Sequence, residues 1–508
     1  MPTLTRLLQA VTLSLLLCKT VSATVSISPL FNDHMVLQQN AAIHIWGTAT
    51  NDEKITVVFA GKMATTHSSK GEWEISFASM PAGGPYTMVI KASNILTVHD
   101  ILIGDVWICA GQSNMRFRVN QSFDADIALL QSNNDHLRLS DWEGILNPIN
   151  QRYPLYFLRA MTTGNFYTSR EWKKSDSAAV AGFSAVGYFF GNTVQQSMHI
   201  PIGLINNSIG GVPAETYIPL SELASDSILS PLAGTNWLHH PLYPVWTGER
   251  VMQNLVAWKE EAPGSPMPAH PYQPGFLFDA AIAPLKKLAI KGVLWYQGES
   301  NATFTADSSQ MDPSINKRKL ALLINSWRRY FENAALPFVI IQLPSVKRDW
   351  ETYREIQSDL SKEINHVSTV VTLDLGHTTD VHPRNKKTVG ERAARAALAN
   401  VYQQKIISGG PVMQSFRTEG KYLILSFSNA ISGLSTKDGE SLRRVMVCGA
   451  DKVFYTAQAQ FKKNELWLSA NEVTNPIAAR YAWEDDPFDA NLINNEGLPA
   501  SPFRTDRW

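Results

Sequence analysis

Between residues 105 and 402 the sequence alternates short apolar runs with longer amphipathic stretches, and this alternation constrains the fold more than any other feature. Apolar runs of about four to eight residues without polar alternation predict buried strands. The amphipathic stretches predict helices, and strands that alternate with helices form a parallel sheet. We therefore expect an α/β unit, with strands at 106–110, 202–206, 291–296, 337–342 and 368–375 and helices at 183–198, 281–289, 315–331, 349–364 and 386–402.

Short β-like runs separated by turn residues lie on both sides of this unit. Before it they fall at 42–46, 54–59, 72–77 and 86–91, which favours a small β-sandwich. After Gly409-Gly410-Pro411 they fall at 422–427, 444–447, 452–457 and 466–469, which favours a second all-β unit. A chain of 508 residues exceeds what one core usually supports. We expect a β-sandwich at 24–100, an α/β unit at 101–404 and a β-rich unit at 405–508.

The strand–helix alternation lapses at about 217–276, where the sequence is rich in Pro and Trp. A stretch this long without clear elements inside a compact unit is usually functional. We expect it to be an insertion and not a part of the sheet.

The first 23 residues have the composition of a signal peptide. Arg6 supplies the positive charge, 7–17 is the apolar segment, and Val21-Ser22-Ala23 is a small-residue cleavage pattern. The apolar segment is too short to span a bilayer, and no later stretch is long enough. We expect a protein of the secretory pathway, lysosomal or secreted, that has no membrane span.

The composition excludes some partners and leaves the state of the thiols open. Lys+Arg and Asp+Glu are both 45, so no basic excess favours nucleic acid or anionic lipid. Beyond residue 23 only Cys109 and Cys448 remain, and either a bridge or two free thiols is possible. Three glycosylation sequons begin at Asn120, Asn206 and Asn301.

Polar motifs follow the predicted strands, where the carboxyl ends of parallel strands form a crevice. Ser113 comes directly after the first strand, and a sharp turn at Gly111 can present its hydroxyl as a nucleophile. The elbow Gly-x-Ser-x-Gly needs glycine at position 115, where Met stands, so the α/β-hydrolase fold is disfavoured. The other motifs span 206–211, 295–301 and 374–383.

These motifs, in this order, resemble those of the SGNH hydrolases, and more narrowly those of the sialate O-acetylesterases. The strings that carry the resemblance are Gly111-Gln112-Ser113-Asn114-Met115, Gln297-Gly298-Glu299-Ser300-Asn301 and Asp380-Val381-His382-Pro383-Arg384-Asn385-Lys386. The resemblance implies an SGNH-type three-layer parallel sheet. It also implies a serine esterase that removes O-acetyl groups from sialic acids, most often at the 9-O position, through an acyl-enzyme.

The resemblance assigns Ser113 as the nucleophile, His382 as the general base and Asp380 as the carboxylate that supports it. A serine hydroxyl needs a histidine to take its proton, and the carboxylate stabilises the imidazolium. The wider superfamily spaces this pair as Asp-x-x-His, whereas one residue separates Asp380 from His382. Asp374 and His377 have the wider spacing and remain the alternative pair.

The oxyanion donors implied by the resemblance are the Ser113 N–H, the Gly211 N–H and the Asn301 side-chain amide. Gly210 is an alternative to Gly211, because the two glycines are adjacent. We expect Asn301 to carry no glycan, because its amide would face the active site. Three further residues are expected to shape the pocket: Gln112, Gln297 and Glu299.

We expect no metal and no cofactor, because the sequence has neither paired metal-ligand spacing nor a glycine-rich phosphate loop. Two alternatives stay open: an acetylesterase for other polysaccharides such as acetylxylan, and an inert glycan-binding module. A sialate carboxylate favours a nearby arginine, for which Arg116 and Arg118 are candidates. The sequence leaves open the oligomeric state and the choice between the 9-O and 4-O positions.

Overall fold

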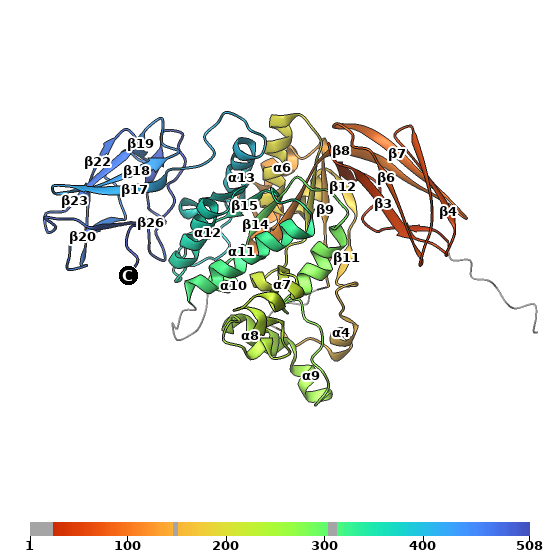
Figure 1. Ribbon diagram of the computed structural model, residues 1–508. Helices are drawn as coiled ribbons and strands as arrows, with labels where there is room; N and C mark the ends of the chain where they lie inside the picture. The colour runs from red at the N-terminus through yellow and green to blue at the C-terminus, as the bar shows by residue number, and fades with distance from the viewer. Residues whose placement is uncertain (1–23, 146–150, 303–311) are drawn as a thin grey trace, which may run out of the picture.

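The structure is a computed structural model that describes residues 24–145, 151–302 and 312–508 (Figure 1). The predicted signal peptide lies outside the described residues. The fold is mixed α/β with several sheets. Strands from the two ends of the chain lie on opposite sides of a central sheet with its helices (Figure 1).

The central sheet is parallel except at one edge. Its strand order is β12-β9-β13-β8-β14-β15-β16, and β12 pairs antiparallel with β9. The sequence did not predict β9 or β12, because polar residues interrupt both. The strands are β8 (Ile95–Gly111), β9 (Asn134–Asp141), β12 (Trp172–Ser175), β13 (Ile202–Asn206), β14 (Gly292–Tyr296), β15 (Phe338–Ile341) and β16 (Val367–Val370).

Helices cover both faces of this sheet, which explains why β8 is apolar without alternation. Val106 and Ile108 join the core formed with α11 (Pro313–Tyr330) and α12 (Glu351–Glu363). Trp107 and Cys109 join the core formed with α6 (Ala185–Met198) and α13 (Lys386–Asn400). Successive side chains of a strand point to opposite faces, so a strand buried on both faces has no polar side.

The N-terminal strands connect directly to the central sheet through β8. The first half of β8 pairs with β7 and β2, and its second half pairs with β13 and β14. The predicted boundary at residue 100 therefore falls inside one strand. The strands that precede β8 are β1 (Ser26–Ile27), β2 (Val36–Gln38), β3 (Ile43–Thr48), β4 (Lys54–Phe59), β5 (Lys62–His67), β6 (Glu72–Phe77) and β7 (Gly83–Lys91).

The C-terminal strands form two four-stranded sheets and one two-stranded sheet around a separate apolar core. Ion pairs join them to the central helices, as in the contact of Arg504 with Glu355 at 3.0 Å. The strands are β17 (Val412–Glu419), β18 (Tyr422–Ser428), β19 (Leu434–Thr436), β20 (Val445–Cys448), β21 (Phe454–Thr456), β22 (Gln458–Lys462), β23 (Glu465–Ser469), β24 (Ala478–Tyr481), β25 (Leu492–Asn494) and β26 (Phe503–Arg504).

Two predicted elements are shorter or different in the structure. The strand expected at 368–375 is β16, which ends at Val370, and a 3₁₀ turn, η7 (Leu373–Leu375), follows it. The turn forms because the Leu375 N–H donates to the Thr372 carbonyl. The helix expected at 281–289 is instead a π turn, η5 (Phe278–Ile282), and a 3₁₀ turn, η6 (Ala283–Leu285).

The region 217–276 contains more regular structure than its sequence predicted. It folds into short helices that lie below the sheet in Figure 1. Pro219 and Pro244 stand at the N-caps of two of them, where proline needs no N–H donor. The helices are α7 (Leu220–Ser225), η3 (Ser230–Ala233), η4 (Trp237–His239), α8 (Val245–Asn254) and α9 (Val256–Glu261).

The remaining short helices and strands connect the larger elements. They are α2 (Ser113–Arg116), η1 (Val119–Gln121), α3 (Ala125–Leu130), β10 (Glu143–Gly144), α4 (Leu155–Ala160), β11 (Tyr167–Ser169), α5 (Ser177–Ala181), η2 (Ala214–Tyr217) and α10 (Glu299–Ala302). Cys109 and Cys448 are both buried and free. None of the helices in the described ranges is long and apolar enough to cross a membrane.

Candidate active site

Ser113 stands at the end of β8, as the first residue of α2. The chain turns at Gly111, whose φ of 133° is rarely adopted by other residues. A Cβ at Gly111 would also lie 2.1 Å from the Tyr296 carbonyl oxygen of β14. The glycine therefore lets the chain turn against β14, and the turn presents Ser113 at the carboxyl edge of the sheet.

His382 reaches Ser113 from the loop before α13. Its Nε2 lies 2.7 Å from the Ser113 hydroxyl oxygen, which is hydrogen-bond distance. Burial lowers the pKa of His382, the nearby Lys386 ammonium lowers it further, and Asp380 opposes both effects. A neutral imidazole can accept the serine proton, so this environment suits a general base.

Asp380 contacts the backbone of His382 and not its ring. Its Oδ1 accepts a hydrogen bond from the His382 backbone N–H at 2.8 Å. Within the described ranges, Nδ1 of the His382 ring has no hydrogen-bond partner. Because only one residue lies between them, the Asp380 carboxylate reaches the backbone N–H of His382 and stabilises the turn that holds the ring.

The alternative pair Asp374 and His377 does not assemble into a catalytic pair. Both carboxylate oxygens of Asp374 accept from the Arg392 guanidinium at 2.7 Å. Nδ1 of His377 accepts the backbone N–H groups of Thr379 at 3.3 Å and Asp380 at 3.1 Å. Asp374 thus pairs with α13, and the exposed His377 stabilises a loop turn.

The glycine loop after β13 lies against Ser113. A Cβ built on Gly210 would lie 3.9 Å from the Ser113 Cβ. The carbonyl of Gly210 accepts from the Tyr272 hydroxyl, and the carbonyl of Gly211 accepts from the Ser300 hydroxyl, both at 2.9 Å. No acceptor in the described part of the chain takes the N–H of Ser113 or of Gly211. The loop is held by its carbonyls and leaves the two donors available.

Asn301, the predicted third oxyanion donor, lies beneath the cavity and is not among the residues that line it. Its side chain is fully buried, and its Nδ2 donates to the Glu215 carboxylate at 2.9 Å. Its Oδ1 accepts from the Ala214 N–H at 2.8 Å and from Gln297 Nε2 at 2.6 Å. These buried partners engage Oδ1 and one N–H of Nδ2, and they hold Asn301 beneath the cavity.

The three predicted pocket residues meet at the base of the site. Gln112 Oε1 accepts from Gln297 Nε2 and from the Ser300 N–H, both at 3.2 Å. Glu299 Oε1 accepts from Asn114 Nδ2 at 2.5 Å. Gln112 and Glu299 line the cavity, whereas the Gln297 side chain is fully buried beneath it.

Lys386 and Asn114 are parts of the site that the sequence analysis did not single out. Asn114 links three segments, because it donates to Glu299 and to the Val381 carbonyl and accepts from the Lys386 ammonium. Lys386 is fully buried, which lowers its pKa to about 7, and burial raises the pKa of Glu299 to about 6. Both residues lie within the quoted motifs, but their pairing depends on the fold.

Ser113 and His382 open into a cavity of about 200 Å³. Trp246, Arg348 and Trp350 line it as well. Sequence reasoning missed these three residues, because two come from the loop between β15 and α12 and one comes from α8 in the 217–276 region. The signal that could have found Arg348 and Trp350 is their position after a parallel strand, at the same edge as Ser113.

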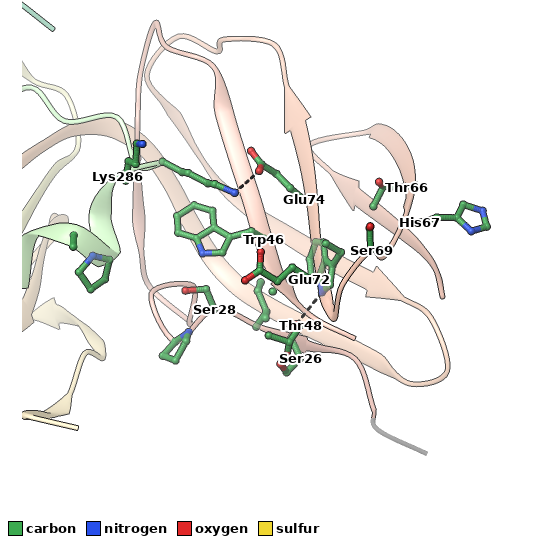
Figure 2. Close-up of a pocket in the computed structure, with 17 residues that line it drawn as sticks. Ser26, Ser28, Trp46, Thr48, Thr66, His67, Ser69, Glu72, Glu74 and Lys286 are labelled. Atoms are coloured by element: carbon green, nitrogen blue, oxygen red, sulfur yellow. Dashed lines mark hydrogen bonds and ion pairs between the residues drawn. The ribbon is translucent and has the colours of Figure 1, made fainter. Parts of the chain in front are cut away.

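A larger cavity of about 680 Å³ lies between the N-terminal strands and η6 (Figure 2). Trp46 and Glu74 stand on its wall. The Glu74 carboxylate is paired: it contacts Lys287 and also Nδ1 of His44 at 2.9 Å. His67 lines the cavity too, but its Nδ1 lies 3.2 Å from Asp52. The described residues of this larger cavity contain no serine–histidine pair, so the chemistry lies at Ser113.

The chain is similar to known carbohydrate esterases in sequence. Residues 256–399 match the family model described as "Carbohydrate esterase, sialic acid-specific acetylesterase". The sialate O-acetylesterase of Rattus norvegicus is 26% identical over 93% of this chain and 92% of its own. The sialate O-acetylesterase of Homo sapiens is 25% identical over 93% of this chain and 91% of its own.

A solved structure is similar as well. The crystal structure of a carbohydrate acetylesterase from Xanthomonas citri superposes with a TM-score of 0.78 at 29% identity. The match covers 96% of this chain and 100% of that one. Two proteins of this length that superpose so completely share their architecture.

The comparisons and the site together define the chain as a carboxylic ester hydrolase. Within that class it is similar to the sialate O-acetylesterases along nearly its whole length. The resemblance stated from the sequence motifs is thereby confirmed.

Proposed function

We propose that this chain removes O-acetyl groups from sialic acids with Ser113 as the nucleophile. The observation that carries the proposal is the 2.7 Å contact between the Ser113 hydroxyl and Nε2 of His382 at a cavity wall. The similarity to sialate O-acetylesterases over 93% of the chain supports the substrate class.

In the first half-reaction His382 takes the Ser113 proton while Oγ attacks the acetyl carbonyl carbon. The tetrahedral intermediate collapses, the bond to the sugar oxygen breaks, and the imidazolium returns its proton to that oxygen. A water molecule then attacks the acetyl-serine with His382 again as the base. Acetate leaves and Ser113 is restored. Asp380 stabilises the imidazolium by its negative charge and keeps the His382 backbone in place.

The oxyanion of the intermediate is stabilised by the N–H groups of Ser113 and Gly211. We assign the third donor to Gln112 and not to Asn301. The Gln112 side chain lines the cavity, and two donors hold its Oε1, which leaves its Nε2 without an acceptor in the described part of the chain. Gln112 is also next to the nucleophile in sequence, so its amide is within reach of the reacting carbonyl.

Replacing the nucleophile tests the proposal. We expect Ser113→Ala to lower kcat on a chromogenic acetate ester by several orders of magnitude without changing Tm. Ser300→Ala is the matched comparison, because it removes the other cavity hydroxyl, which donates to the Gly211 carbonyl and has no histidine beside it. Its loss should be far smaller. A folded Ser113→Ala enzyme with substantial activity would remove Ser113 from the mechanism.

A second candidate function is the deacetylation of other polysaccharides. The specific observation that favours it is the superposition on the carbohydrate acetylesterase from Xanthomonas citri. The same serine and histidine would serve either substrate. Turnover of O-acetylated sialosides measured beside that of acetylated xylo-oligosaccharides decides between them, and a purely glycan-binding module would hydrolyse neither.

The proposed architecture is a three-layer SGNH-type unit at 101–404, between an N-terminal β-sandwich and a C-terminal β domain that begins near residue 405. The parallel order of β9, β13, β8, β14, β15 and β16 supports it. We propose a lysosomal or secreted location on the composition of residues 1–23. Fusion of those residues to a reporter, with secretion as the readout, tests the location.

A further inference from the structure

Arg348 differs from the other arginines near the nucleophile, because its charge has no ion-pair partner among the residues that the structure describes. Arg348 is exposed, it lines the 200 Å³ cavity with Ser113 and His382, and its guanidinium makes no ion pair or hydrogen bond within the described ranges. An unpaired guanidinium in a reaction cavity can accept an anionic ligand without first breaking an internal contact.

The two arginines that the sequence suggested as carboxylate receptors are already engaged. Arg116 donates to Asp141 at 3.2 Å and to the Trp142 carbonyl at 3.1 Å. Arg118 donates to the Gly182 carbonyl at 2.7 Å and to Glu143 at 3.2 Å. Neither lines the cavity. Both arginines therefore connect neighbouring segments of the fold. This leaves Arg348 as the candidate that can bind an anionic ligand in the cavity.

The loop that bears Arg348 is fixed at the cavity edge. The Arg348 N–H donates to the Val346 carbonyl at 2.7 Å, and the Arg348 carbonyl accepts from the Trp350 N–H at 2.6 Å. The neighbouring Lys347 N–H donates to the Thr378 carbonyl at 2.9 Å, which joins this loop to the loop that leads to His382. The backbone that carries the Arg348 guanidinium is therefore held at the edge of the cavity, where a substrate would bind.

The other charged and aromatic groups of the cavity suit an acidic sugar. Glu299 is the one acid in the described lining, and it is buried at the base, where Asn114 donates to it. Trp246, which is half-buried, supplies aromatic surface that can pack against a sugar ring, whereas Trp350 is buried in the cavity wall. The accessible part of the cavity lining thus includes the Arg348 cation and the Trp246 indole.

We propose that Arg348 binds the carboxylate of the substrate and makes this esterase prefer O-acetylated acidic sugars over neutral ones. The inference rests on the proposed esterase function, because it concerns the sugar that the Ser113 site accepts. A planar guanidinium can donate two parallel hydrogen bonds to a carboxylate, which a neutral sugar acetate does not offer. Arg348 is thus a specificity residue that leaves the acetyl chemistry to Ser113 and His382.

The test compares wild type and Arg348→Ala on three acetate esters: O-acetylated sialic acid, the same compound with its carboxylate converted to a methyl ester, and 4-nitrophenyl acetate. On the free acid we expect Arg348→Ala to lose about ten- to hundredfold in kcat/KM, mainly through a higher KM. Wild type should lose a similar factor on the methyl ester, and Arg348→Ala should add little to it. On 4-nitrophenyl acetate, which has no carboxylate, the loss caused by Arg348→Ala should be far smaller than on the free acid.

Lys347→Ala is the matched control, because Lys347 is an exposed cation one residue away that does not line the cavity. It should match wild type on all three esters, and Arg348→Lys should recover only part of the loss, since an ammonium lacks the two-pronged geometry. An equal loss by Arg348→Ala on all three esters would overturn the proposal in favour of a structural role.

Failure of this inference can be told apart from failure of the proposed function. If wild type hydrolyses the sialic acid ester and Arg348→Ala does so with the same kcat/KM, only the Arg348 assignment is wrong. If wild type hydrolyses none of the three esters, the esterase function itself fails. If wild type acts on 4-nitrophenyl acetate and acetylated xylo-oligosaccharides but not on the sialic acid ester, the acidic-sugar preference is overturned while the esterase chemistry stands.

Discussion

His382 and His377 show how two histidines five positions apart in the chain acquire different roles. His382 reaches the Ser113 hydroxyl, whereas His377 accepts backbone hydrogen bonds within its own loop. We expect His382→Ala to lose several orders of magnitude in kcat and His377→Ala to lose about tenfold or less. Steady-state rates of both purified variants on one acetyl ester check this. A nearly normal His382→Ala beside an inactive His377→Ala would transfer the base to His377.

The charge of Asp380 can be tested separately from its hydrogen bond. In Asp380→Asn the amide oxygen can still accept the His382 backbone N–H, so only the negative charge is lost. We expect kcat to fall by about two orders of magnitude or more, because nothing then stabilises the imidazolium. Rates on one ester, with Tm as the folding control, are sufficient. Retention of normal kcat would show that Asp380 acts only on the loop backbone.

The pH dependence of the esterase follows from the groups around His382. Burial and Lys386 lower the pKa of His382, so the acid limb of kcat/KM should lie below the usual histidine pKa of about 6.5. Asp380→Asn should move the limb further down, because the carboxylate raises this pKa. Lys386→Met should move it up, because an opposing ammonium is lost. Shifts of both variants in one direction would contradict this electrostatic account.

At the scale of elements, α11 joins the sheet to the helical region at 217–276 through a buried ion pair. Lys319 Nζ lies 3.0 Å from Glu215 Oε1 and donates to the Leu242 carbonyl at 2.7 Å. Both charged side chains have no exposed surface, and Glu215 also holds the Asn301 amide. One ion pair thus connects α11, η2 and α10 directly beneath the active site.

Removing one charge of this ion pair should lower the free energy of unfolding more than removing both charges. Lys319→Met leaves the Glu215 carboxylate buried without its cation, and we expect the free energy of unfolding to fall by about 3–5 kcal/mol. Urea denaturation measures the loss. The double variant Lys319→Met with Glu215→Gln removes both charges and should be more stable than Lys319→Met alone. Equal stability of the single and double variants would show that the buried charge is not the cause.

At the scale of the whole molecule, the fold distinguishes among the three glycosylation sequons. Asn120 is exposed in η1. Asn206 is buried at the end of β13 and donates to Asp141 at 2.6 Å, and Asn301 is fully buried beneath the active site. Only a nitrogen that reaches solvent can bear a glycan in the folded protein.

We therefore expect a single occupied sequon, at Asn120, when the chain is expressed through a secretory route. Peptide mapping after enzymatic deglycosylation identifies the modified asparagine. Asn120→Gln should remove all of the glycan mass at these three sequons. A glycan found at Asn206 or Asn301 would contradict the burial of those side chains.

Much of the fold followed from sequence periodicity, because a strand buried on both faces leaves a continuous apolar run. The strands at 202–206, 292–296 and 338–341 and the helices α6, α11 and α13 lie within a few residues of their predicted positions. The polar strands β9 and β12 and the short helices of 217–276 were not predictable, because tertiary packing and not local pattern stabilises them.

The sequence by itself determined the alternation of parallel strands and helices, the serine after the first strand and the histidine before the last helix. Local chemistry is sufficient for these features, since each depends on a few adjacent residues. Only the tertiary structure decided that His382 and not His377 meets Ser113, that the Asn301 amide donates to Glu215, and that Arg348 lines the cavity without an ion-pair partner among the described residues. The first two outcomes depend on contacts between distant residues, such as Asn301 and Glu215 at a separation of 86, and no local pattern encodes such a contact.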